Sequence, residues 1–224
     1  MITKPALPPN TPPEAGANRG RRERKRRQTA DHLATTAFRL FETQGYEAVT
    51  MEQIAVEADV AKGTLYSYFP LKEALLAHQF HQELADHLVP LQTAMDAPSG
   101  FAARMTVLLD ASADWSETRR AYLLYYLRFR LTHTECGEKG EDDAPHLSSG
   151  LDRVFEALIR AGQSTGELRT HLPPDQLARM FQFLYLGALT RWLTRPNHDL
   201  RQALNAALDL FLHGLIAPAA QERS

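Results

Sequence analysis

Residues 62–68, which read KGTLYSY, hold polar and aromatic side chains and no acidic one. The members expected to face outward and to do chemistry are Lys62, Gly63, Thr64, Tyr66 and Tyr68. Ammonium and hydroxyl groups donate hydrogen bonds, and a glycine lets another molecule approach the backbone closely. The outward face of a soluble helix is normally rich in mixed charges, so this composition indicates contact with a polyanion such as DNA.

Lys72 begins a later helical segment, where the helix macrodipole disfavours a cation. A phosphate bound at this helix start would remove the cost, because free backbone amides and the ammonium would hold it together. The alternative is a solvated charge beside Glu73, which is the commoner situation for a lone lysine on a helix.

A second group of cations leads into the first predicted helix. Seven Lys and Arg residues and one Glu lie between Arg19 and Gln28, a local charge of +6 in a chain whose formal net charge is −2. Beside a DNA-binding segment, such a basic arm is expected to contact phosphates or the minor groove, with a solvated tail as the alternative. The members expected to make contact are Arg24, Arg26 and Arg27.

Two short helices and a tight turn position the residues at 62–68. Thr50 and Gln53 have the spacing of a capping box, which predicts a helix start at residue 51. Asp59 and Val60 make the turn, and the small Ala55 and Ala58 permit a close helix crossing. This pattern predicts a helix-turn-helix, whose second helix lies in the major groove of DNA.

Helical periodicity recurs along most of the chain, whereas the alternation typical of strands is nearly absent. Helices are predicted at 24–44, 51–58, 62–69, 72–95, 101–114, 117–133, 147–164, 174–194 and 199–215. The expected architecture is all-α: a disordered proline-rich tail (1–20), a three-helix DNA-binding domain (21–71) and a C-terminal helical domain (72–217). Residues 134–150 are expected to form a mobile acidic loop.

The chain from about residue 27 to residue 76 resembles the DNA-binding domain of the tetracycline-repressor (TetR) family. The resemblance rests on Thr50, Ile54, Ala55, Ala58, Val60, Gly63, Leu65, Tyr66, Tyr68, Phe69, Lys72 and Glu73 at fixed spacing. It implies base-edge contacts by Lys62, Gly63 and Tyr66. It implies phosphate or sugar contacts by Thr50, Thr64, Tyr68 and Lys72.

Two positions depart from the family pattern. Ala61 and Leu71 stand where capping residues are common before a helix, and each missing cap costs about 1 kcal/mol of helix stability. Residues 62–69 contain no arginine, so a bidentate guanine contact has to come from elsewhere or be absent.

The last two predicted helices carry apolar residues on two faces, which predicts burial on two sides. In the resembled family the last two helices pair with their copies in a four-helix bundle, which implies a homodimer. The residues expected in that interface are Phe181, Leu184, Ala188, Trp192, Leu204, Leu208 and Phe211. The alternative is a purely internal core.

An aromatic stripe within residues 121–134 is expected either to belong to the core or to line a pocket for a small-molecule effector. The expected pocket residues are Trp115, Tyr122, Tyr125, Tyr126, Phe129, Phe155 and Phe183. Arg128 and Arg130 lie off this stripe and are expected to snorkel or to pair with the acidic loop. The predicted effector is therefore apolar or aromatic, and a cation would also suit the tyrosine faces.

Several classes of function find no support. The chain has a single cysteine, Cys136, and shows no nucleophile–base pair or phosphate-binding loop, so neither an enzyme nor a cofactor is expected. His78, His81 and His87 do not share one face, so we expect exposed histidines rather than a metal site. The longest stretch without Asp, Glu, Lys or Arg, from Leu210 to Gln221, is shorter than the roughly 20 residues of a membrane helix.

No apolar signal segment is evident, and we expect a cytoplasmic protein. The hypothesis is a DNA-binding regulator, most simply a repressor that an effector releases from a palindromic operator in double-stranded DNA. The alternative is an all-α small-molecule-binding or scaffolding protein with a vestigial DNA-binding segment. The outward Lys62, Thr64, Tyr68 and Lys72 argue against that alternative.

Overall fold

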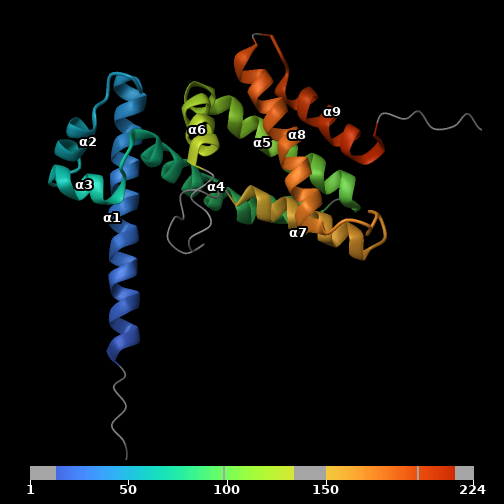
Figure 1. The fold of residues 1–224 in the computed structure, drawn as a ribbon, viewed down its shortest axis with the longest axis horizontal. Helices are drawn as coiled ribbons and strands as arrows, with labels where there is room; N and C mark the ends of the chain where they lie inside the picture. Colours follow the sequence, from blue (N-terminus) through green and yellow to red (C-terminus); the bar gives the residue numbers. More distant parts are fainter. Residues whose placement is uncertain (1–13, 98, 134–149, 196, 215–224) are drawn as a thin grey trace, which may run out of the picture. The chain divides into compact units, whose positions relative to one another are not determined.

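The computed structural model describes residues 14–97, 99–133, 150–195 and 197–214. This part of the chain is helical and contains no strand. The helices (Figure 1) are α1 (Glu14–Gln44), α2 (Met51–Glu57), α3 (Lys62–Tyr68), α4 (Lys72–Asp96), α5 (Phe101–Thr118), α6 (Arg120–His133), α7 (Leu151–Ser164), α8 (Pro174–Thr194) and α9 (Leu200–His213). None of the helices has the length and apolar character of a membrane span in the part described.

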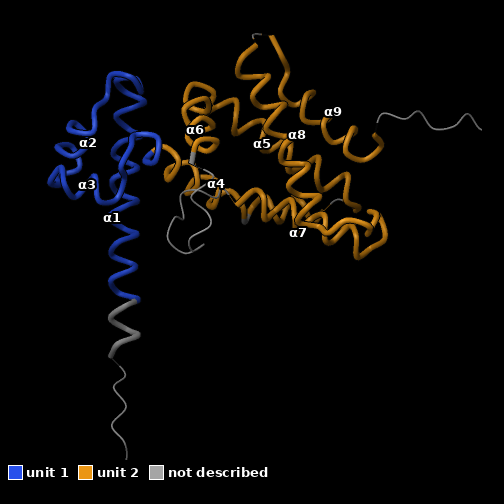
Figure 2. The backbone as a smooth tube through the Cα atoms, in the orientation of Figure 1, with its two compact units in different colours: residues 1–75 blue, residues 76–224 orange. Residues whose placement is uncertain are grey.

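The chain divides into two compact units, residues 1–75 and residues 76–224 (Figure 2). Helix α4 begins in the first unit and continues into the second. The predicted all-α class is confirmed. One boundary is wrong: α1 begins at Glu14, inside the stretch expected to be a disordered tail. The tail's prolines end at Pro13, so nothing after that position prevents the helix from extending. The predicted acidic loop lies outside the described residues, except for Gly150.

The first unit folds around one apolar face of α1. Leu33, Ala37 and Phe41 of that face are at most 1% exposed, which follows from their spacing of four residues. Gly45 ends the helix with φ +87°, and its amide donates to the carbonyl of Phe41 at 2.9 Å. A glycine is suited to this position because L side chains rarely adopt positive φ.

Helices α2 and α3 form the predicted helix-turn-helix. The capping box is present: the amide of Gln53 donates to the Thr50 hydroxyl at 3.2 Å, and the Thr50 amide donates to Gln53 Oε1 at 2.8 Å. Asp59 makes the turn in the left-handed region, with φ +53°. Helix α3 begins after Ala61 without a side-chain cap, so packing of the fully buried Leu65 has to hold it in place.

In the second unit α8 packs against both α7 and α9, and α5 packs against α9 and α7. Phe181 of α8 is in the middle of an aromatic cluster, with ring centroids 4.9 Å from Phe155 of α7 and 5.1 Å from Phe211 of α9. Glu167, between α7 and α8, accepts the Phe101 amide at 2.6 Å and so caps the start of α5. These contacts hold α5 and α8, two of the helices that surround the cavity described below.

Candidate functional site

The outward face of α3 has the polar surface expected for contact with DNA. Lys62, Gly63, Thr64 and Tyr66 are exposed, and Tyr68 is half-buried. No atom lies within 4 Å of the place where a β-carbon on Gly63 would be, so another molecule can approach the backbone there. Lys62, Gly63, Thr64 and Tyr66 are therefore accessible to another molecule, and their contact with DNA stays a prediction.

Lys62 has a partner that the sequence reasoning missed. Its Nζ lies 2.5 Å from Glu52 Oε1 of α2, and both side chains are more than half exposed. The hydrogen bond between them lowers the pKa of Glu52 and raises the pKa of Lys62. Glu52 and Lys62 are ten residues apart, so only the crossing of α2 and α3 brings them together. No spacing rule within one helix could have found this pair.

Thr50 can serve the capping box and a phosphate at once. Its hydroxyl oxygen accepts the Gln53 amide, while its own O–H proton is the donor left for an external acceptor. The position at the start of α2 also favours an anion, because free amides point outward there.

The contacts of Lys72 differ from both sequence interpretations, a phosphate ligand and a solvated charge. Its Nζ donates to the carbonyls of Tyr46 and Val49, each at 2.8 Å, and lies 4.5 Å from the centre of the Tyr46 ring. These carbonyls follow α1, and their partial negative charge offsets the unfavourable position of a cation at a helix start. These contacts account for the cation at the helix start without a phosphate, and the phosphate contact of Lys72 stays a prediction that the family resemblance implies.

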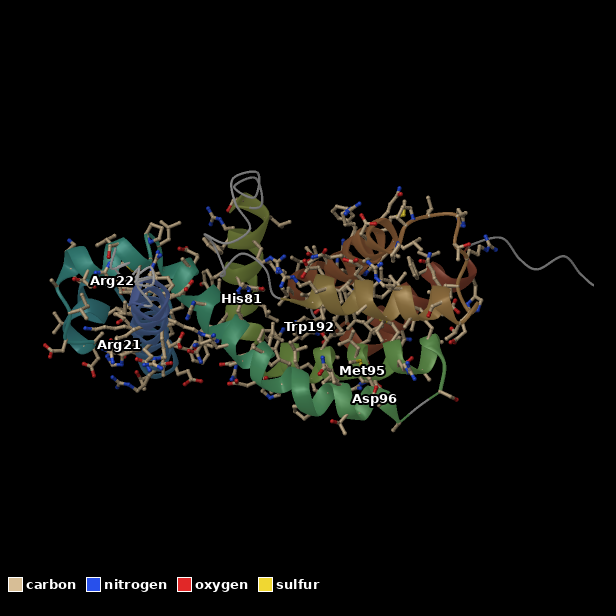
Figure 3. The ribbon with its side chains drawn as sticks, turned by 90° about the horizontal axis from the view of Figure 1, so that it is seen from below. Arg21, Arg22, His81, Met95, Asp96 and Trp192 are labelled. Carbon is tan, nitrogen blue, oxygen red and sulfur yellow. The ribbon has the colours of Figure 1, made fainter. Side chains whose placement is uncertain are left out.

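The basic arm is part of α1 rather than a separate extended segment. Residues 20–28 are exposed and helical, and Figure 3 labels Arg21 and Arg22 on this helix. Helical spacing places Arg24 and Arg27 on one face and Arg26 on another. All three cannot contact the same phosphate row while this stretch stays helical.

A cavity of about 310 Å³ lies in the second unit, between α4, α5, α6 and α8, with Leu151 of α7 at its wall. Half of its lining residues are leucines. The polar or aromatic lining residues are His87, Ser112, Trp115, Tyr126, Arg130, Gln182 and Tyr185. A largely apolar chamber with a few polar groups is the usual form of a small-molecule site.

Two of the seven expected pocket residues, Trp115 and Tyr126, line this cavity. Tyr122, Tyr125, Phe129, Phe155 and Phe183 do not. Phe129 and Phe155 are buried outside it, and Phe183 is 75% exposed. The face of α6 that lines the cavity carries Leu123, Tyr126, Leu127 and Arg130, which is rotated from the predicted aromatic stripe.

Polar side chains on the cavity wall are linked to one another. The Tyr126 hydroxyl lies 2.9 Å from His81 Nε2 of α4, and Arg130 Nη1 donates to the same hydroxyl at 3.3 Å. Tyr185 and Ser112 are joined by a 2.6 Å hydrogen bond between α8 and α5, and burial raises the pKa of Tyr185. The expected exposure of His81 was wrong, because His81 is half-buried. Arg130, which was not expected to meet a ligand, lines the cavity. Its expected pairing with the acidic loop concerns residues outside the described part of the chain and stays a prediction.

The contact between Tyr126 and Arg130 had a signal in the sequence, whereas the contact of His81 had none. Tyr126 and Arg130 are four residues apart, so they share a helix face. The predicted aromatic stripe took only the aromatic residues of α6 into account and therefore left Arg130 out. His81 lies on α4 and is half-buried (Figure 3). Its contact with Tyr126 spans 45 residues and depends on how α4 and α6 pack.

Most of the residues expected at a dimer interface lie inside the second unit. Phe181, Trp192, Leu204 and Leu208 are at most 5% exposed, and Phe211 packs on Phe181. Burial against α5, α7 and α9 already covers the face of α8 and α9 that carries them. Leu184 and Ala188 are half-buried. The exposed large apolar residues of α8 are instead Met180, at 49%, and Phe183, at 75%.

Comparisons with known proteins match this arrangement. Residues 33–78 match the model of the "Bacterial regulatory proteins, tetR family". The chain is 30% identical over 173 residues to the transcriptional repressor KstR of Rhodococcus jostii, covering 75% of each chain. It is 27% identical over 201 residues to KstR of Mycolicibacterium smegmatis, covering 89% of this chain and 91% of that one.

The fold has a close counterpart among solved structures. The Thermus thermophilus repressor FadR in complex with lauroyl-CoA matches 87% of this chain and 99% of its own, with a TM-score of 0.72 and 22% identity. At that identity the likeness concerns the fold. With the helix-turn-helix, the family model and the relatives in agreement, the chain belongs to the tetR family of bacterial regulatory proteins and is a DNA-binding transcriptional regulator.

Proposed function

We propose that this regulator is a homodimeric repressor that leaves a palindromic operator when a small apolar effector fills the cavity between α4, α5, α6 and α8. The observation that carries the proposal is the cavity itself. Its α4 wall is formed by Leu84, Leu88 and Leu91, and the same helix begins at Lys72 in the helix-turn-helix unit. A ligand that shifts α4 therefore acts on both units through one continuous helix.

Relatives support the direction of regulation. The KstR proteins of Rhodococcus jostii and Mycolicibacterium smegmatis are named repressors. The FadR fold neighbour was solved with lauroyl-CoA, a ligand with a long apolar chain. By analogy this chain represses transcription and responds to a ligand with an apolar body. A regulator of this kind acts on the chromosome, so its place of action is the cytoplasm.

On the DNA side, the exposed α3 face is proposed to enter the major groove. Lys62, Gly63 and Tyr66 face base edges, and Thr50, Thr64 and Tyr68 contact the backbone. Arg24 and Arg27 share the face of α1 that adds phosphate contacts, and Arg26 approaches other phosphates. Two copies of this surface in a dimer require a palindromic operator.

The dimer surface is proposed to lie on the exposed side of α8. Met180 and Phe183 expose large apolar side chains there, with Leu184, Gly187 and Ala188 beside them at helical spacing. Contiguous apolar surface of this kind marks an interaction site more often than it occurs on a monomer without function. Small residues at 187 and 188 permit close approach of a partner helix.

One experiment tests the regulatory cycle. Selection of bound sequences from random double-stranded DNA should yield a palindrome, and decan-1-ol should then weaken binding of the full-length protein to it. Ala111→Phe, which places a ring in the cavity, should remove this response while DNA binding persists. The matched control is Ala102→Phe, at an exposed position of the same helix, which should respond like the wild type. An operator without symmetry would contradict the dimeric arrangement, and an unchanged response in Ala111→Phe would place the effector elsewhere.

A further inference from the structure

The charged group on the cavity wall already has a partner within the protein. Among the described lining residues Arg130 is a permanent cation, and none is an aspartate or a glutamate. Arg130 Nη1 donates to the Tyr126 hydroxyl at 3.3 Å, and that hydroxyl also lies 2.9 Å from His81 Nε2. A cationic ligand would meet a like charge here, with no carboxylate on the described wall to balance it. Because Arg130 is paired, the wall does not by itself require an anionic ligand either.

Two uncharged hydroxyl groups meet where α5 and α8 line the cavity. Ser112 Oγ of α5 lies 2.6 Å from the Tyr185 hydroxyl of α8, and both residues are part of the lining. A hydroxyl has one proton and two lone pairs, so the bond between the two oxygens leaves this pair able to form further hydrogen bonds. A ligand in the cavity can therefore be bound by a polar group on this wall.

A third uncharged polar group lies on the same face of α8. Gln182 precedes Tyr185 by three residues, the spacing of neighbours on one helix face, and it also lines the cavity. Its side chain is half-buried and has no hydrogen-bond partner among the residues that the structure describes. An amide offers two donors and one carbonyl acceptor. A purely apolar ligand would remove water from these groups and return no hydrogen bond, which is unfavourable.

The wall at Tyr185 disfavours a charged oxygen. Burial raises the pKa of Tyr185, and this effect exceeds the opposing effects of the neighbouring serine hydroxyls and of the positive charge of Arg130. The phenol therefore stays protonated, and a ligand carboxylate in the same place would lose its hydration in the same way. An uncharged oxygen, as in an alcohol or a ketone, is less costly to bury and still forms the hydrogen bonds.

We propose that the effector is an uncharged amphiphile, whose hydroxyl or carbonyl oxygen hydrogen-bonds to Gln182 and to the Ser112–Tyr185 pair while the leucines of the cavity hold its apolar body. This inference rests on the proposed effector cavity, and it specifies the class of ligand and the place of its polar group. An uncharged ligand differs from the cation that the tyrosine faces of α6 would also suit.

Four probes that share a phenyl ring and a five-carbon chain test the proposal: 5-phenylpentan-1-ol, pentylbenzene, 5-phenylpentanoate and 5-phenylpentan-1-amine. Titration of the full-length protein gives each dissociation constant from tryptophan fluorescence, to which Trp115 on the cavity wall contributes. The alcohol should bind about tenfold more tightly than pentylbenzene, the factor expected for one hydrogen bond. The carboxylate and the amine should both bind more weakly than the alcohol.

The double variant Gln182→Leu, Tyr185→Phe keeps the shape of the wall and removes two of its polar groups. It should bind pentylbenzene at least as tightly as the wild type, which also shows that it is folded, and should lose the preference for the alcohol. The matched control makes the same two changes at residues that do not line the cavity, Gln202→Leu on α9 and Tyr125→Phe on α6. This control should keep the tenfold preference.

Equal binding of the alcohol and pentylbenzene by the wild type would overturn the polar contact and keep the cavity. Tighter binding of the carboxylate or of the amine than of the alcohol would overturn the uncharged ligand. A preference for the alcohol that persists in the double variant would overturn the assignment to Gln182 and Tyr185. Binding of none of the four probes would overturn both this inference and the proposed effector cavity. The order of affinities in the wild type tests the ligand class even where the double variant does not fold.

Discussion

Single side chains in this protein act through partners that come from other helices. Lys62 on the proposed DNA-binding face is paired with Glu52, and Lys72 donates to the carbonyls of Tyr46 and Val49. The two lysines therefore differ in how available their ammonium groups are to DNA. The partner of Lys62 is an exposed carboxylate, which a phosphate can replace, whereas Lys72 fixes the loop after α1 from a half-buried position.

Glu52→Gln should strengthen DNA binding at low salt by about threefold, because an exposed ion pair is weak and its loss frees the Lys62 ammonium for a phosphate. Fluorescence anisotropy with an operator fragment measures the change. Glu57→Gln is the control, since Glu57 lies on the same helix and pairs with Arg39 instead. An equal gain in both variants would mean that only the total charge of α2 matters.

Gly63→Ala should separate stability from recognition. Alanine is the better helix former and meets no atom within 4 Å, so the free energy of unfolding should rise by up to about 1 kcal/mol. DNA affinity should fall by about tenfold, the loss of one base contact, because a methyl group stands between the backbone and the groove. Urea unfolding and anisotropy measure the two effects. Unchanged DNA affinity would show that the backbone at Gly63 stays away from the bases.

At the scale of elements, several helix ends are satisfied by groups that lie outside the helix. The start of α2 is capped locally by Thr50 and Gln53. The start of α5 has no local cap, since Gly100 precedes it, and depends on Glu167 from the segment between α7 and α8. The cap of α2 therefore depends on four consecutive residues, whereas the cap of α5 is a tertiary contact.

Glu167→Ala should lower the urea midpoint at neutral pH, because the Phe101 amide loses its acceptor. Hydrogen bonds from Phe101 and Thr165 lower the pKa of Glu167 from its ordinary value of 4.5. A carboxylate with a lowered folded-state pKa stabilises fully above its unfolded value and loses that effect as the pH falls through the folded value. The difference between wild type and variant should therefore be constant above about pH 5.5 and shrink below 4.5.

Glu117→Ala provides the control for that comparison, because Glu117 is exposed near the end of α5. Its midpoint should stay close to that of the wild type. A Glu167→Ala difference that persists unchanged at pH 3 would show that the carboxylate charge is not what caps α5.

At the scale of the whole molecule, the proposed regulation needs two copies of the chain and a route between its two units. The core of the second unit already uses Phe181, Trp192 and Leu204, so replacing them would unfold the chain rather than separate two copies. The exposed side of α8 remains for a partner, and α4 is the covalent route between the units.

Phe183→Arg should convert a dimer into a folded monomer, because the side chain is 75% exposed in the single chain and contributes little to its core. Sedimentation equilibrium measures the mass, and circular dichroism checks the helix content. Leu124→Arg, at a 54% exposed position of α6, should remain dimeric. A dimeric Phe183→Arg protein would place the interface on another surface.

The sequence by itself determined the helices, the helix-turn-helix and the outward face of α3. These features depend on relations within a few residues, such as the Thr50–Gln53 capping box, the repeat of Leu33, Ala37 and Phe41, and the glycine after α1. Local backbone geometry translates such spacings directly into structure, and the family resemblance supplied the role of that face.

Tertiary structure alone decided which apolar and charged groups of the second unit meet each other. Phe181 and Phe183 differ by two positions on α8, yet one is fully buried and the other is exposed, because α7 and α9 cover only one side of the helix. In the same way Arg130 enters the cavity wall through a contact to Tyr126 that His81 of α4 supports. The sequence of a helix that is apolar nearly all round does not determine which of its faces is buried. Packing against the adjacent helices determines which face lies in the core, at the cavity or on the surface.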